Sequence, residues 1–276
     1  MKPSNYSLNI RTTARGRESF GQRSLKLAAI ALFAAACAIS IFKSSSLTQA
    51  HASSGPDSAS RQKPETASER HARERFDYLV RADFFAGFAG DQAAFDRAMK
   101  LCEDTLAKNP KHAEAMVWHG GGLLFRSGQL FQKGDTQKGM ELWDRGLKEM
   151  DTAVELEPDN VGVLIPRGAS LIPVSRFVPS PDQAKALLQK GVNDYEKVLE
   201  IQKAYFAKLS GHGRGELLFG LAEGWQRLGN AEKARAYFQR IVTDAQGSER
   251  QKQARAFLET GTLPPSSQSC TGCHTK

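Results

Sequence analysis

Apolar residues in most of this chain recur at the spacing of an amphipathic α-helix. The first clear stripe has an apolar residue at every fourth position, at Phe76, Val80, Phe84 and Phe88. Ser68, shortly before this stripe, is a suitable N-cap residue. Similar stripes continue to a polar segment at Glu249–Glu259, which we expect to be the last helix, and no segment alternates with period two. The pattern predicts an all-α body over residues 68–260.

Two short patterns repeat inside this body. The segments 105–110 and 153–158 both end in proline, which cannot continue a helix and suits the start of the next one. A second pattern places a small residue between large apolar ones in the segments 116–123, 164–171 and 218–225, with the small residue at Gly120, Gly168 and Ala222. A small side chain lets two antiparallel helices approach closely, so the repeats predict helical hairpins.

These segments resemble the tetratricopeptide (TPR) repeat family, whose signature combines the same small and large positions. The resemblance implies a TPR-like solenoid of about four degenerate helical hairpins over roughly residues 70–245; an unrelated helical bundle is the alternative. Pro110 and Pro158 are 48 residues apart rather than the usual 34. We expect the extra fourteen residues to form a loop within Ser127–Gly139, and a second irregular stretch at Ile172–Pro181.

The resemblance also implies a concave groove, lined by the first helix of each hairpin, that holds a peptide of a protein partner. Core packing or a solvated surface position is the alternative for each residue. The residues expected at this groove are Glu114, Val117, Gly121, Leu124, Phe125, Ile165, Ala169, Glu216, Phe219, Glu223 and Arg227.

The N-terminus has the pattern of an export signal or a membrane anchor. Sixteen uncharged residues, Leu27–Phe42, follow six basic ones, so the chain after Phe42 is expected outside the cytoplasm, on the periplasmic side of the inner membrane. The segment is either retained as an anchor or removed after Ala52. Residues 44–67 are rich in Ser, Ala, Gly and Pro, which predicts a flexible linker. A buried helix of a cytosolic protein is the alternative for the apolar run.

The charge of the chain is concentrated in this same N-terminal region. The 276 residues carry a net charge of +8; residues 1–43 contain seven basic groups and one acid, which is +6, and the remaining 31 basic and 29 acidic groups sum to +2. The body therefore has no basic excess that would indicate nucleic-acid binding.

The tail at residues 261–276 contains the most specific chemical motif. Cys270-Thr-Gly-Cys273-His274 has the C-x-x-C-H spacing and resembles the attachment site of c-type haem. The resemblance implies that both thiols bond the vinyl groups of one porphyrin and that His274 ligates the iron. A redox-active dithiol, a zinc site and an inert tail are the alternatives.

Only Thr275 and Lys276 follow the motif, so the haem is expected to be covered by the preceding helices, by a partner, or not at all. A tethered haem can reach back to the body, where the side chains that could ligate iron from the second side are His112, His119, His212, Met99, Met116, Met140 and Met150. His212, in the glycine-rich segment 211–215, is expected to be the most accessible, whereas His119 and Cys102 are expected to be core residues.

No catalytic constellation occurs in the chain, so an enzyme is the less favoured class. Gly120-Gly121-Gly122 lies inside an expected helix, where it favours close helix contact over anion binding. The sequence predicts an anchored scaffold or adaptor that carries one haem c and serves protein interaction, with electron transfer or sensing at the haem. The alternatives are a plain interaction module without haem and a haem enzyme with an open iron site.

Overall fold

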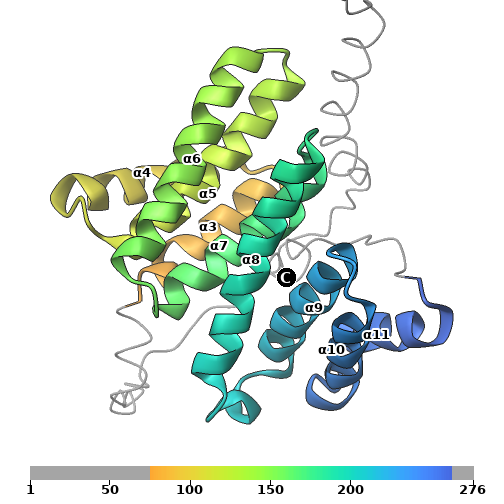
Figure 1. Cartoon of the computed structure of the whole chain (residues 1–276). Helices are drawn as coiled ribbons and strands as arrows, with labels where there is room; N and C mark the ends of the chain where they lie inside the picture. The colour runs from red at the N-terminus through yellow and green to blue at the C-terminus, as the bar shows by residue number, and fades with distance from the viewer. Residues whose placement is uncertain (1–74, 263–276) are drawn as a thin grey trace, which may run out of the picture.

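Helices form almost all of the part of the chain that the structure describes. The computed structural model describes residues 75–262, which contain nine α-helices, two short 3-10 segments and no β-strand (Figure 1). The all-α prediction is confirmed for this range. The α-helices are α3 (Phe76–Phe88), α4 (Gln92–Lys108), α5 (Ala113–Gln132), α6 (Thr136–Leu156), α7 (Val161–Val174), α8 (Pro181–Gln202), α9 (Gly211–Arg227), α10 (Ala231–Asp244) and α11 (Glu249–Thr260), with η2 (Ser175–Phe177) and η3 (Phe206–Lys208) on either side of α8.

Consecutive helices form four hairpins that pack side by side. Helices α3 and α4, α5 and α6, α7 and α8, and α9 and α10 contact each other most extensively. Each odd-numbered helix also contacts the next odd-numbered helix, and each even-numbered helix contacts the odd-numbered helix that follows it. Helix α11 packs on α9 and α10, where Phe257 stacks on Phe238 with ring centroids 4.0 Å apart. The expected helix at Glu249–Glu259 is confirmed.

Three of the four hairpin turns use the same local chemistry. In each, a glycine with positive φ is followed by an Asp or Asn whose side chain accepts a hydrogen bond from a backbone N–H in the first turn of the next helix. Glycine adopts this backbone conformation without steric cost, and the carboxylate or amide oxygen caps the helix. These pairs are Gly90 (φ 113°) with Asp91, Gly134 (φ 81°) with Asp135, and Gly229 (φ 85°) with Asn230.

Two of the predicted small residues, Gly120 and Gly168, lie where paired helices come closest. A Cβ atom on Gly120 of α5 would lie 2.7 Å from the carbonyl oxygen of Gly146 on α6, and the reverse distance is the same. A Cβ on Gly168 of α7 would lie 2.4 Å from the ring of Tyr195 on α8. Gly220 of α9 stands equally close to the other side of that ring, so Tyr195 fills the space between two glycines on different helices.

The expected loop at Ser127–Gly139 is wrong. Only three residues, 133–135, separate α5 from α6, and the fourteen extra residues lengthen both helices. The comparison with the α9–α10 hairpin shows where they are added. Helix α5 continues for twelve residues after its small residue Gly120, whereas α9 continues for five after its small residue Ala222. On the second helix of each hairpin, α6 has ten residues before its small residue Gly146, whereas α10 has three before its small residue Ala234. Seven residues, about two turns, are thus added to each helix, and the tip of this hairpin projects beyond its neighbours (Figure 1).

The expected irregular stretch at Ile172–Pro181 is shorter than predicted. Helix α7 continues through Val174 with Pro166 and Pro173 inside it, and η2 follows directly.

A buried ion network joins three helices: Arg167 of α7 donates two hydrogen bonds of 2.7 Å to Asp194 of α8 and one of 2.9 Å to Asp151 of α6. Burial raises the pKa of Asp194 although the bonds from Arg167 oppose it.

Replacing Gly120 with alanine is expected to lower the free energy of unfolding by about 1–3 kcal/mol, because the new methyl group would collide with the backbone of α6. Urea unfolding followed by circular dichroism measures the change. Gly121→Ala is the matched control, since its Cβ would meet only side-chain ends, the terminal carbon of Met150 at 3.3 Å and Ser170 Oγ at 3.5 Å, and the helix itself gains from alanine. Equal destabilisation by the two variants would contradict the close-approach explanation.

Candidate functional site

The sequence motifs for haem attachment and membrane anchoring lie outside the described residues. Cys270, Cys273 and His274 follow the last described residue, and the apolar run 27–42 precedes the first. Within 75–262 no group of three or more His, Cys, Asp or Glu residues is arranged to hold a metal ion. In the same range no helix is both long and apolar enough to cross a bilayer.

Most of the side chains considered as a second iron ligand are committed to the helical core. Met99 and Met150 are buried, Met116 packs partly buried, and Met140 is exposed. His112 caps α5, where its Nδ1 accepts the Ala115 N–H at 3.2 Å. Cys102 has no exposed surface, and burial raises the pKa of its thiol, so it is an inert core residue as expected.

His119 is a buried, hydrogen-bonded core residue, as the sequence predicts. Its side chain is 2% exposed, and its Nδ1 lies 2.5 Å from Oε2 of Glu149 on α6. Arg145 donates to the other oxygen of Glu149 at 2.8 Å. Burial pushes the pKa of Glu149 upward, but the bonds from His119 and Arg145 outweigh it and hold that pKa below its usual value. His119 therefore helps to hold α5 against α6.

His212 does not lie in a turn as expected, because α9 begins at Gly211 and includes it. Ser210 caps this helix through its hydroxyl, which accepts the Gly213 N–H at 3.0 Å. The His212 side chain is exposed, and its Nδ1 is 4.0 Å from Glu216 Oε1 on the next turn. Of the histidines in the described part of the chain, it is the most exposed.

The apolar residues expected at the partner groove mostly pack inside the domain. Val117 has no exposed surface and Phe219 is 8% exposed, so neither lines an open groove. Leu124 is buried too, and the ring of Phe125 packs against those of Phe88 and Phe95. Gly121 and Ile165 are partly buried, and Ala169 is exposed.

The charged residues expected at that groove are engaged in bonds between helices. Glu114 accepts the Phe76 N–H at 3.0 Å and the amide of Asn160 at 3.1 Å, which ties α3 and α7 to α5. Glu216 accepts two bonds of 2.9 Å from Arg250 of α11. The third group joins α9 to the end of α7 and η2: Arg227 donates to Ile172 O and Ser175 Oγ at 2.7 Å, and Glu223 binds Arg176 at 2.5 Å.

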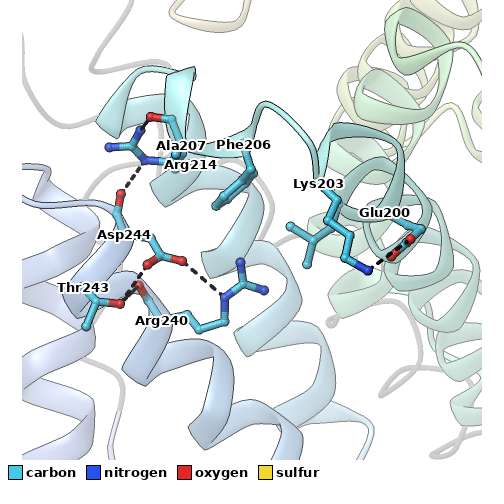
Figure 2. A pocket seen from close by; sticks show the side chains of 9 residues that line it. Glu200, Lys203, Phe206, Ala207, Arg214, Arg240, Thr243 and Asp244 are labelled. Carbon is cyan, nitrogen blue, oxygen red and sulfur yellow. Dashed lines mark hydrogen bonds and ion pairs between the residues drawn. The ribbon is translucent and has the colours of Figure 1, made fainter.

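An open pocket of about 570 Å³ lies at the opposite end of α9, between the C-terminal ends of α8 and α10 (Figure 2). We call it the α8–α10 pocket; its lining consists of Leu199, Glu200, Lys203, Phe206, Ala207, Arg214, Arg240, Thr243 and Asp244. Arg214 reaches across it and donates to the backbone oxygens of Ala207, Leu209 and Asp244. No pattern in the sequence indicates this pocket, because its residues come from four separate elements and share no motif.

Comparison with known proteins adds no family assignment. A scan against protein-family models finds no family that matches this chain, and a search of curated proteins finds no significant match.

Replacing Glu149 with glutamine is expected to remove a stability contribution of about 1–2 kcal/mol at neutral pH. Folding lowers the pKa of the Glu149 carboxyl, so this group stabilises the folded state at pH values above its unfolded pKa of about 4.3. The contribution is lost as the pH falls through the lower pKa of the folded state. Urea unfolding of both proteins at several pH values should show their difference shrinking below pH 4. Glu103→Gln is the control, because Glu103 is exposed and lies 3.7 Å from the other ring nitrogen of His119. A difference that grows on acidification would refute this assignment.

Proposed function

We propose that this protein is an exported, membrane-anchored helical scaffold that carries one covalently attached c-type haem. The observation that carries the proposal is the sequence Cys270-Thr-Gly-Cys273-His274, which follows the helical domain. The uncharged run 27–42 behind a basic N-terminus supports it independently, since haem of this kind is attached outside the cytoplasm. Both features indicate the same compartment.

Each residue of the motif has a distinct part in holding the group. The thiols of Cys270 and Cys273 form thioether bonds with the porphyrin, and the imidazole of His274 binds iron. When bound, the haem would supply one-electron redox chemistry or binding of a small ligand. The donor set suits haem better than zinc, because two cysteines and one adjacent histidine leave a tetrahedral zinc short of a fourth ligand.

The helical domain serves as a docking scaffold in this proposal, with a TPR-like arrangement. Support comes from hairpins that contact through successive odd-numbered helices and from small residues at the close approaches, Gly120 and Gly168. The polar outer face of α11, with Lys252, Arg255 and Glu259 exposed, suits the end of such a stack. The partner is a protein that binds the exposed surface of the first helices, around Ala169.

Covalent haem is tested with the full chain made in a host that carries out cytochrome c maturation. The purified protein should show a Soret band that stays with the polypeptide after denaturation and acid–acetone extraction. Cys270→Ala/Cys273→Ala should lose it, whereas Cys102→Ala, which removes a buried thiol, should keep it if folded. A colourless wild-type protein with both tail thiols open to alkylation would leave only the helical docking module.

Anchoring is tested by fractionating cells that express the full chain. We expect the protein in the membrane fraction, resistant to salt extraction and digested by protease added to spheroplasts. A chain in which Leu27–Phe42 is replaced by a cleavable signal peptide should be soluble in the periplasm and still coloured. Recovery of the wild-type chain in the cytoplasm would contradict the export proposal.

A further inference from the structure

The α8–α10 pocket presents cationic groups with unused hydrogen-bond donors. Arg240 donates from Nε to Asp244 at 3.3 Å, and within residues 75–262 its two terminal nitrogens make no hydrogen bond. Arg214 uses Nε and Nη1 for backbone oxygens, which leaves Nη2 without a bond in the same range. Lys203 is 75% exposed, and its one ion pair in the described part of the chain is with Glu200, at 3.5 Å. Arginine forks of this kind match the two oxygens of a carboxylate.

The same pocket has an apolar side. Phe206 and Leu199 line it, and the guanidinium of Arg240 lies 5.4 Å from the centroid of the Phe206 ring. Figure 2 shows the Phe206 ring beside the guanidinium of Arg240. A volume of about 570 Å³ is within the range of about 300–1,000 Å³ found for small-molecule and cofactor sites. The combination fits a ligand with a flat apolar body and carboxylate groups at one edge.

We propose that the α8–α10 pocket binds the propionate edge of the haem that the tail carries, with Arg240 as the main carboxylate partner. This inference rests on the proposed function, which supplies the haem. None of the nine lining residues is His, Met or Cys. The pocket therefore holds the carboxylate edge of the porphyrin and leaves the iron to His274 and to ligands from elsewhere.

The length of the tail allows this contact. Gln251 of α11 donates to the backbone oxygen of Val242 at 2.8 Å, so the first turn of α11 lies against the last turn of α10, next to the pocket. From Gln251 to Thr260 the helix rises about 14 Å. The ten residues from Thr260 to Cys270 span up to about 33 Å when extended. Cys270 can therefore return to the pocket.

The carboxylate interaction is tested first with free iron protoporphyrin IX and the full-length Cys270→Ala/Cys273→Ala chain, which cannot attach haem. Arg240→Gln should weaken binding about ten-fold or more, the cost of losing a charge-assisted bond. Lys203→Gln, at an exposed position that does not threaten folding, should weaken it by a smaller factor. Arg235→Gln, an exposed arginine on the same helix outside the pocket, is the matched control and should bind as the parent does.

The dimethyl ester of the same porphyrin separates carboxylate recognition from apolar adsorption. Its binding should be equal in the parent and in the Arg240→Gln chain. Porphyrin binding that is the same in the parent and in both pocket variants, or an ester that depends on Arg240 as strongly as the free acid, would overturn the proposal.

The haem-loaded protein gives the second measurement. Amide hydrogen exchange in segments 203–214 and 240–244 should be slower in the loaded wild-type chain than in the double-cysteine variant. Loaded Arg240→Gln should lose this protection, and loaded Arg235→Gln should keep it. Covalent haem without any such protection would refute the docking while leaving the proposed function intact. A wild-type chain without covalent haem would refute the proposed function. The titration with free porphyrin would then by itself show whether the pocket binds the carboxylate edge of a porphyrin.

Discussion

Close approach of paired helices at small residues is the constraint on which the rest of this structure depends. Gly120 and Gly146 bring α5 and α6 together at the carbonyl groups of their backbones. Gly168 and Gly220 make room for one aromatic ring, that of Tyr195, from two sides. A methyl group at any of these four positions would collide with a neighbouring helix, so this packing requires glycine there.

The polar residues of the first helices bind their neighbouring helices. Arg167 joins three helices through two aspartates, and Arg227 binds backbone and side-chain oxygens at the end of α7 and in η2. Breaking such a buried pair costs more than forming it contributes, since the remaining charge is left without a partner. A partner protein would therefore meet the exposed edges of this face, while its charged centre stays bound within the domain.

In the proposed function the tail and the helical domain have different roles. The motif at Cys270–His274 would hold the porphyrin and its iron, and the domain would provide surroundings for the carboxylate edge. The α8–α10 pocket, with Arg240, Arg214 and Phe206, has the charge and the apolar surface for that purpose. In this proposal the tail would carry the redox chemistry, and the hairpins would place it relative to a partner.

The sequence by itself determined the helical class, the small residues Gly120 and Gly168 at close contacts, the buried positions of His119 and Cys102 and the helix at Glu249–Glu259, because these follow from local periodicity and from side-chain size. It did not determine what the fourteen extra residues do, since seven residues added to each of two paired helices leave the same pattern of spacing as a loop. The sequence also did not distinguish residues that line a groove from residues of the core. Val117 and Phe219 would be apolar in either position, and only the packing of neighbouring helices buries them. The α8–α10 pocket was decided by tertiary structure alone, because its cations come from three separate elements that the fold brings together.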